Sequence, residues 1–336
     1  MGLAAQRSAF SGFDRQVQCE NLAPDILCPL DGESSSPFGQ LAAHFFQVFA
    51  RLKPALVSAP RGKGWATQLL RKVASPGVHF SLTERKIQVS AAFLFLALAT
   101  FAPAQWIEKN SGDESSFDGR VVHRHVDLAE TQTDNRAIVD LALFSAKSSK
   151  LRVIDNADGV ALSGAMRRTN CIAGINGGYF DPNFAPLGLR IIDGKVTSRL
   201  TRGRLMSGVL SSDNAIHIFR VAEFSLRRKP NAAIECGPFL VDFAKSVRGL
   251  EAMRAARRTF AATGSGDRAA LGFCSDATLA DLARILATPL GDFKIQRALN
   301  LDGGSSSAFW FRRDDSSAFS IPEEKSVRDF VGIVAK

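Results

Sequence analysis

Residues 187–196 read LGLRIIDGKV, in which two apolar runs flank the dipeptide Asp193-Gly194. Asp-Gly between apolar runs is typical of a tight hairpin turn, because both turn residues must adopt a positive φ. The second half of the chain is therefore predicted to form antiparallel hairpins. Two further pairs of runs show the same pattern, 209–210 and 216–219 around Asp213-Asn214, and 260–263 and 269–273 around Gly264-Ser265-Gly266.

Other strand-like runs precede and follow these hairpins. Apolar and β-branched residues predict strands at 121–126, 138–144, 151–154 and 298–301. The polar stretch 145–150 separates two of these runs. We therefore expect 138–144 and 151–154 to pair as a hairpin around it.

One helix is predicted inside the same domain. Apolar residues recur at helical spacing from Leu279 to Leu286, Asp276 is the predicted N-cap, and Pro289 ends the pattern. Many hairpins with few helices indicate an α+β fold, with mixed or antiparallel sheets, a few packed helices and a single catalytic domain. The sequence contains no G-x-G-x-x-G or P-loop motif, which argues against nucleotide sites of those kinds.

The composition is that of an ordinary folded protein. The chain has 336 residues, of which 46% are apolar and 22% charged, which excludes full-length disorder, a collagen repeat and a multi-span membrane protein. The formal net charge of +9 is spread over both residues 1–110 and 111–336. Nucleic-acid binding usually shows a basic stripe with interleaved aromatic residues, and none occurs here. No nucleic-acid partner is therefore expected.

An uncharged segment lies between Lys86 and Glu108, and its core at 91–102 reads AAFLFLALATFA. This core is short compared with the roughly 20 residues that span a bilayer. Arg85-Lys86 before it and small residues after it predict a secretory signal peptide or an uncleaved signal-anchor at 87–107. A buried helix of a soluble domain is the alternative. A signal would place the protein in the periplasm, outside the cell or anchored with its domain outside the cytoplasm, touching membrane only through 87–107.

The predicted signal divides the chain into four segments. Residues 1–86 form a poorly organised N-terminal extension, 87–107 the signal, 108–119 a polar linker and 120–336 the domain. A signal this far along the chain has two explanations. The natural start lies downstream, near Val78 or Leu82, or the segment is an anchor preceded by a short cytoplasmic part.

Four loops that follow or enter predicted strands carry the candidate chemistry. In residues 175–181, INGGYFD, two glycines let backbone approach a ligand, and their free N–H groups would cradle an anion. Asn176 would bind a hydroxyl or phosphate oxygen, and Asp181 would act as acid, base or metal ligand. The alternative is a tight turn that Asp181 caps.

The other three loops each add one charged side chain: two add a carboxylate and one adds an arginine. Glu235 lies before a Gly-Pro turn, although a lone glutamate is more often solvated. Arg258 offers a planar fork for phosphate, although a surface salt bridge is the commoner outcome for one arginine. Asp302 ends a strand and is followed by Gly-Gly and three serines, which resembles an anion-binding nest beside a carboxylate.

These motifs, in this order, closely resemble the phosphodiester glycosidase family over roughly Cys171 to Phe311. The resemblance implies hydrolysis of the glycosidic bond of a sugar-1-phosphodiester, such as one of GlcNAc, on a glycan outside the cytoplasm. Tyr179 stands where phenylalanine is common and Ser305 where many members have a third glycine. The motifs that carry the resemblance are INGGYFD, PLGLRIIDGK, ECGPFLV, RRTFAATGSGDRAALGF, TLADLARIL and ALNLDGGSSSAFW.

The resemblance also assigns the site. It implies that Asp302, Asp181 and Arg258 are catalytic, with Arg258 binding the phosphate and an aspartate acting as nucleophile or base. The residues it implies for substrate binding are Asn176, Gly177, Gly178, Thr259, Gly303, Gly304 and Ser306.

Several alternatives stay open at this point. A second candidate function is a non-catalytic envelope module that binds phosphorylated glycans or exopolysaccharide. No cofactor is expected to be required, although calcium at a loop aspartate is possible without a spaced EF-hand ligand set. His123 and His125 share a strand face as metal ligands could, but ordinary strand histidines are favoured. Two of the three domain cysteines could pair, or all could be buried thiols.

Overall fold

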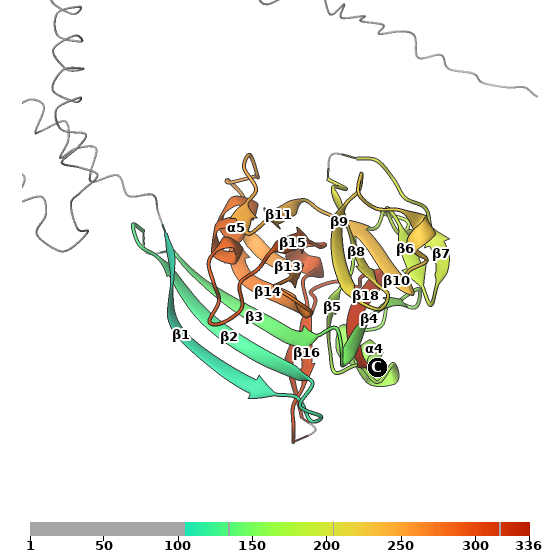
Figure 1. Cartoon of the computed structure of the whole chain (residues 1–336), viewed down its shortest axis with the longest axis horizontal. Coiled ribbons are helices and arrows are strands. Elements are labelled where there is room, and N and C mark those ends of the chain that lie inside the picture. Colours follow the sequence, from blue (N-terminus) through green and yellow to red (C-terminus); the bar gives the residue numbers. More distant parts are fainter. Residues whose placement is uncertain (1–104, 134, 204, 316) are drawn as a thin grey trace, which may run out of the picture. The chain divides into compact units, whose positions relative to one another are not determined.

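The computed structural model describes residues 105–133, 135–203, 205–315 and 317–336 (Figure 1). The predicted extension at 1–86, and the predicted signal at 87–107 except for its last three residues, lie outside the described residues. None of the helices in the described ranges has the length and apolar character needed to cross a membrane.

The largest element is an eight-stranded sheet, here called the large sheet. Each neighbouring pair in it runs antiparallel. In spatial order its strands are β1 (Trp106–Ser115), β2 (Val121–Glu130), β3 (Arg136–Ser145), β14 (Arg268–Ala277), β13 (Ala256–Thr263), β15 (Arg297–Asn300), β11 (Phe239–Asp242) and β12 (Lys245–Ser246).

Two five-stranded antiparallel sheets pack beside the large sheet. The first, the hairpin sheet, has the order β7 (Lys195–Ser198), β6 (Arg190–Ile192), β10 (Ala232–Cys236), β8 (Gly208–Ser212) and β9 (Ile216–Arg220). The second, the β5 sheet, has the order β17 (Ala318–Ile321), β16 (Phe309–Arg312), β5 (Ala173–Asn176), β18 (Asp329–Ala335) and β4 (Ser149–Asp155). The helices of the described part are α4 (Leu162–Arg168), α5 (Leu279–Ala287) and the short 3-10 turns η1 (Leu226–Arg228) and η2 (Gly304–Ser306).

Alternation along the strands builds separate cores on the two faces of the large sheet. In β3, Leu141 and Leu143 belong to a cluster with Leu282 and Leu286 of α5. The alternating residues Ala142 and Phe144 belong to the central cluster, which also contains residues of the two smaller sheets. This is the period-two pattern of a strand buried on both faces. The second helix, α4, covers the outer face of the β5 sheet.

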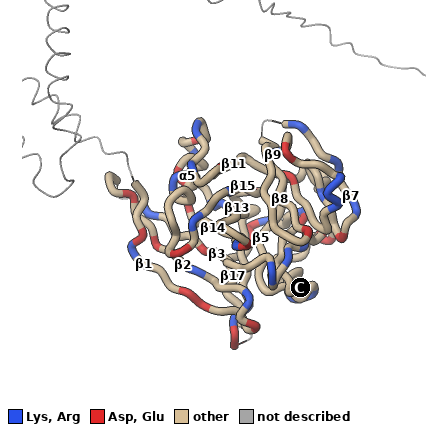
Figure 2. Tube along the Cα trace, in the orientation of Figure 1, with Lys and Arg blue, Asp and Glu red and all other residues tan. Residues whose placement is uncertain are grey.

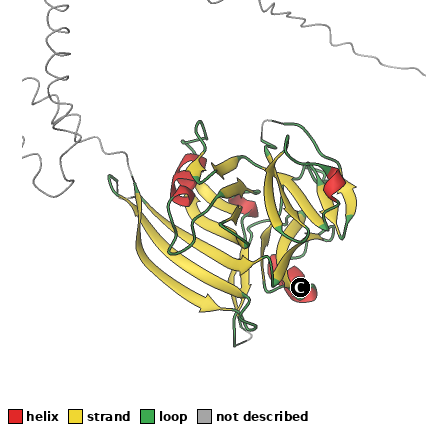
Figure 3. Ribbon diagram, in the orientation of Figure 1, coloured by secondary structure: helices red, strands yellow, loops and turns green. Residues whose placement is uncertain are grey.

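The three predicted hairpins are confirmed as β6–β7, β8–β9 and β13–β14. In the first, Asp193 and Gly194 have φ values of +47° and +78°, as the Asp-Gly turn requires. Antiparallel sheets of hairpins in one domain are also confirmed. The predicted α+β class overstates the helix content, because most of the regular structure in the described residues is strand (Figure 3).

Three sequence predictions are wrong. Most of the predicted linker at 108–119 is strand β1, whose polar residues are exposed while its backbone pairs with β2. The predicted pairing of 138–144 with 151–154 fails because β3 pairs with β2 and β14, whereas β4 pairs with β18 in another sheet. The N-cap of α5 is Thr278, whose side chain accepts a hydrogen bond from the Asp281 amide, and Asp276 still belongs to β14.

Candidate active site

The structure brings the loop after β5 and the loop after β15 together at Asp302. The Asp302 amide donates to the Gly177 carbonyl over 3.1 Å. The Asp302 carbonyl accepts hydrogen bonds from Asn176 Nδ2 at 2.7 Å and from Thr259 Oγ1 at 2.8 Å. Three of the four sequence motifs therefore meet around the backbone of one aspartate.

The side chain of Asp302 is half-buried and keeps access to a ligand. Its Oδ1 accepts the Gly303 amide at 3.0 Å. Burial raises the pKa of this carboxyl above its ordinary value, and hydrogen bonds from Ser306 and Gly303, together with the charge of Lys325, oppose the shift. A carboxyl with a raised pKa is what acid–base chemistry near neutral pH requires.

Arg258, on β13, borders Gly303, the residue that follows Asp302. Its Nε donates to the Ala277 carbonyl at 3.1 Å and its Nη2 to the Arg254 carbonyl at 2.9 Å. Its Nη2 also lies 3.9 Å from the Glu251 carboxylate. The remaining Nη1 faces Gly303, where an added Cβ would lie 3.4 Å from it, and no described residue accepts a hydrogen bond from it. Because these contacts fix the guanidinium and leave Nη1 without an acceptor, Arg258 can bind an anion beside Gly303.

The serine-rich loop shapes the other side of the carboxylate. Gly304 has a φ of +65°, a backbone conformation that favours glycine, and it begins the short turn η2. Ser306 is buried and hydrogen-bonds the Asp302 side chain. Gly303 and Gly304 are partly exposed, so their backbone can reach a ligand.

Tyr179 closes the site towards the turn after β10. Its hydroxyl donates to the Gly237 carbonyl at 2.6 Å, and Asn300 Nδ2 donates to the same hydroxyl at 3.3 Å. Burial raises the pKa of Tyr179 well above its ordinary value, with Cys236 and Asp302 adding to the shift. The phenol therefore stays protonated and holds the Gly237 turn against the site.

The side chains of Asn176 and Thr259 are buried and engaged with backbone groups. Asn176 Oδ1 accepts the Ala308 amide at 3.1 Å, while Asn176 Nδ2 and Thr259 Oγ1 donate to the Asp302 carbonyl. Their role in substrate binding stays a prediction. They are positioning residues that fix the backbone from which the Asp302 side chain projects.

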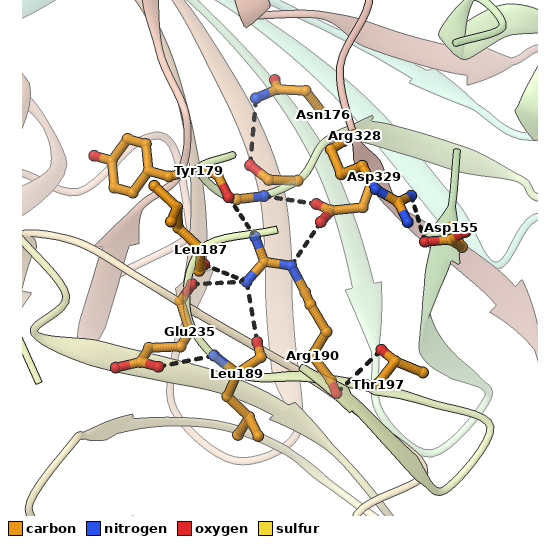
Figure 4. A network of polar contacts seen from close by, with 12 residues as sticks. Asp155, Asn176, Tyr179, Leu187, Leu189, Arg190, Thr197, Glu235, Arg328 and Asp329 are labelled. Atoms are coloured by element: carbon orange, nitrogen blue, oxygen red, sulfur yellow. Dashed lines mark hydrogen bonds and ion pairs between the residues drawn. The ribbon is translucent and has the colours of Figure 1, made fainter. Parts of the chain in front are cut away.

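A buried ion pair holds the loop after β5 (Figure 4). Arg190 Nε donates to Asp329 Oδ2 at 2.6 Å, and both side chains are almost fully buried. Arg190 also donates to the carbonyls of Tyr179, Leu187, Leu189 and Glu235 at 3.0 to 3.2 Å. One guanidinium thus adds hydrogen bonds to the backbone of three chain segments, the loop after β5, the segment that enters β6, and β10.

Gly177 and Gly178 are required by this pair, not by a ligand. The Gly178 amide donates to Asp329 Oδ1 and the Gly177 amide to the Asp329 carbonyl, each at 2.8 Å. A Cβ on Gly178 would collide with Arg190 Nη2, and one on Gly177 with Asp329 Oδ1. The prediction that their amides are free to cradle an anion is therefore wrong, because both amides already have acceptors.

Asp181 and Glu235 have structural partners outside the Asp302 site. Asp181 Oδ1 accepts the amides of Asn183 and Ala185, both at 2.9 Å, so it caps its own turn. Among the described residues, no hydrogen bond or ion pair joins it to Asp302 or Arg258. Glu235 is fully buried, and its Oε2 accepts the Leu189 amide at 2.8 Å. A catalytic role for Asp181 finds no support in these contacts.

The two strand histidines share one carboxylate. Asp140 Oδ1 lies 2.8 Å from His123 Nε2 and 2.9 Å from His125 Nδ1. The described residues contain no group of three or more His, Cys, Asp or Glu side chains arranged to hold a metal. The three cysteines of the described part are free and buried.

Sequence reasoning missed Arg190, Asp329 and Lys325. Arg190 lies inside an apolar strand run and Asp329 immediately precedes one, so a charge placed where alternation predicts burial was the available signal. Lys325 gave no such signal. It follows Glu324, whose amide donates to the Ser305 carbonyl at 2.8 Å, and this contact brings the 322–326 loop to the site.

The Arg190–Asp329 pair generates a stability prediction. Asp329→Asn removes one partner of a buried pair and leaves Arg190 charged without a counter-ion, which costs about 3–5 kcal/mol. We expect a loss of this size in the free energy of unfolding measured by urea titration. Asp155→Asn is the matched control, because Asp155 pairs with Arg328 at an exposed position, where a pair contributes about 0–1 kcal/mol. Equal losses for the two variants would contradict a central role for Asp329.

Comparison with known proteins identifies the domain. Residues 169–334 match the phosphodiester glycosidase family. No curated protein matches the chain in sequence. Among solved structures, the catalytic domain of zebrafish N-acetylglucosamine-1-phosphodiester alpha-N-acetylglucosaminidase, auto-inhibited by its pro-peptide, is 15% identical with a TM-score of 0.47, over 70% of this chain and 85% of that one.

Two bacterial structures are also similar. A hypothetical protein from Synechocystis is 15% identical with a TM-score of 0.44, covering 71% of this chain and 65% of its own. A putative exported protein from Burkholderia pseudomallei is 13% identical with a TM-score of 0.41, and the match covers 60% of this chain and 74% of that one. The family match extends the resemblance of the motifs past Phe311 and confirms it. Residues 169–334 of this chain belong to the phosphodiester glycosidase family.

Proposed function

We propose that the chain hydrolyses the glycosidic bond of a sugar-1-phosphodiester. The observation that carries the proposal is the half-buried Asp302 carboxyl, whose pKa is raised, together with Arg258, whose unsatisfied Nη1 borders the next residue, Gly303. A carboxylate for the sugar carbon and a cation for the phosphate are the two groups that this bond cleavage needs. Family membership supports the same reaction class.

The chemistry assigns a separate task to each group. Cleavage between C1 of the sugar and the bridging oxygen releases a free sugar and a phosphate monoester. Arg258 would bind the phosphate and stabilise the negative charge that grows on the leaving oxygen. A phosphate monoester has a second pKa near 6, so it leaves as an anion with little need for protonation. One carboxylate therefore suffices, which agrees with Asp181 being engaged elsewhere.

Asp302 has two possible routes in this scheme. It attacks C1 directly, which gives retention, or it takes a proton from the attacking water, which gives inversion. Both routes require the ionised carboxylate. The configuration of the first sugar released, read by NMR, distinguishes them.

The proposed reaction also bears on the substrate, the location and the cofactor requirement of this chain. We infer a GlcNAc-1-phosphodiester-like group on a glycan outside the cytoplasm, reached through export directed by residues 87–107. No cofactor is assigned. Calcium takes 6–8 oxygen ligands, and the described residues contain no group of three or more His, Cys, Asp or Glu side chains arranged to hold a metal.

Asp302→Asn tests the mechanism. We expect kcat for release of reducing sugar from a GlcNAc-1-phosphodiester to fall by about 10²-fold to 10⁴-fold, because the proton acceptor or nucleophile is lost. The thermal midpoint at pH 7 should stay equal or rise. A carboxyl whose pKa is raised in the folded state destabilises that state above the raised pKa, and the amide removes this cost.

The pH profile gives an independent readout of the same residue. The wild-type kcat/KM should fall as the pH drops through the raised pKa of Asp302, at a higher pH than an ordinary aspartate would give. Near-wild-type activity of Asp302→Asn would remove Asp302 from the mechanism. Calorimetric binding of the phosphodiester by the wild-type protein, without any sugar release, would favour the non-catalytic binding module.

The neighbouring arginines offer a matched pair of variants. Arg258→Gln should lower kcat by about 10²-fold to 10³-fold, the usual cost of one donor aimed at developing charge. Both arginines also hold the backbone, Arg258 at the carbonyls of Ala277 and Arg254, and Arg257 at the carbonyls of Ser307 and Pro322, so Arg257→Gln should lower stability to a similar degree while leaving kcat of the folded protein near that of the wild type. Comparable losses of kcat in the two folded variants would contradict the assignment of phosphate binding to Arg258.

The proposed export has its own test. Expression of the full chain followed by N-terminal sequencing should give a first residue at or near Gln105, because small residues at 102 and 104 fit a cleavage site. An uncleaved anchor would instead leave the full-length chain in the membrane fraction. Intact chain found only in the cytoplasm would contradict export.

A further inference from the structure

A second concave site lies away from Asp302. A cavity of about 730 Å³ opens at the amino end of β5, where Ile172 lines it, whereas the candidate active-site loop follows the carboxyl end of the same strand. Its volume falls within the about 300–1,000 Å³ of typical ligand pockets. The β1–β2 turn and the β6–β7 turn form its walls, through Phe117 and Asp193.

Cations outnumber carboxylates in this cavity. Its two aspartates are already paired, Asp118 with Arg120 and Asp193 with Arg152, each at 3.3 Å. Lys150 and Arg312 also line it, and no described carboxylate forms an ion pair with either of them. Elsewhere on the domain, basic and acidic residues are interspersed (Figure 2). The cavity therefore carries two uncompensated positive charges.

Arg312 is held ready for a ligand. Its guanidinium lies 4.0 Å from the centre of the Phe117 ring, and Nη2 donates to Asn170 Oδ1 at 3.1 Å. Its Nε is buried and has no acceptor among the described residues. A guanidinium that is held in place by a ring and an amide, and that has no carboxylate partner in the described part of the chain, is suited to bind an anion.

The rest of the lining fits a sugar polymer with acidic groups. Leu151, Ile172 and Val334 provide an apolar floor for the C–H faces of rings, and the amides of Asn170 and Asn231 offer donors and acceptors for hydroxyls. The one aromatic ring, Phe117, is already stacked on Arg312, so it does not offer the free ring face on which the bases of a single-stranded nucleic acid stack.

We propose that this cavity binds an oligosaccharide that carries carboxylate groups, with Arg312 and Lys150 contacting the acids and the asparagines contacting the hydroxyls. The site is separate from Asp302, so the proposal does not rest on the proposed hydrolysis. It supplies the domain with a second point of attachment to an acidic glycan.

Binding of tetragalacturonate to the full chain, measured by calorimetry at low salt, tests the proposal. We expect binding that weakens as salt is raised, and much weaker binding of maltotetraose, the neutral control of the same length. Arg312→Gln should weaken binding at least about tenfold, because it removes a charge-assisted donor. The double variant Lys150→Gln with Arg152→Gln changes two side chains at exposed positions and should weaken binding about threefold to tenfold with an unchanged thermal midpoint.

A lysine outside the cavity provides the matched control. Lys245→Gln removes an exposed charge on β12 and should leave binding unchanged. The proposal is overturned if tetragalacturonate does not bind, if maltotetraose binds equally well, or if Lys245→Gln weakens binding as much as the cavity variants. Tighter binding of a short single-stranded DNA than of tetragalacturonate would overturn it in favour of nucleic acid.

Discussion

The buried contact between Arg190 and Asp329 is the constraint on which the candidate active site depends. It joins the start of β6 to the start of β18, and Gly177 and Gly178 lie against it without room for a side chain. Burying two charges is costly unless their remaining donors and acceptors are satisfied. Here Arg190 also donates to four carbonyls, and Asp329 accepts the Gly178 amide on its side chain and the Gly177 amide on its backbone carbonyl, so the pair ties the loop after β5 to β6, β10 and β18.

The residues of the site therefore fall into two groups. The inner set consists of the side chains of Asn176, Thr259 and Tyr179, which hold the backbone, and the reactive residue is Asp302. Asn176 and Thr259 both donate to the carbonyl of Asp302, and both are buried. The side chain of Asp302 remains partly exposed and has a raised pKa. Stability and reactivity oppose each other at this residue, because the burial that makes the carboxyl a better base also penalises its charge.

The hairpins could be predicted from local sequence, because Asp-Gly and Gly-Ser-Gly turns act over two or three residues. The position of β4 could not, because Ala146 to Ser148 look like an ordinary hairpin turn, and only long-range pairing with β18 shows that the chain changes sheets there. The motif loops were located correctly. The free amides predicted for Gly177 and Gly178 were wrong, since the sequence shows two glycines but not that Asp329 occupies the space beside them.

The two departures from the family pattern show where this chain can differ from its relatives. The hydroxyl of Tyr179 adds a hydrogen bond to Gly237, so this departure tightens the inner set without reaching the substrate side. Ser305 lies at the edge of the site, and its carbonyl accepts the amide of Glu324, next to Lys325. Ser305 carries a side chain where many relatives have glycine, and a charged loop contacts its backbone. We therefore propose that the 322–326 loop and Ser305 select among substrates, whereas the buried Asn176 and Thr259 position the backbone of Asp302.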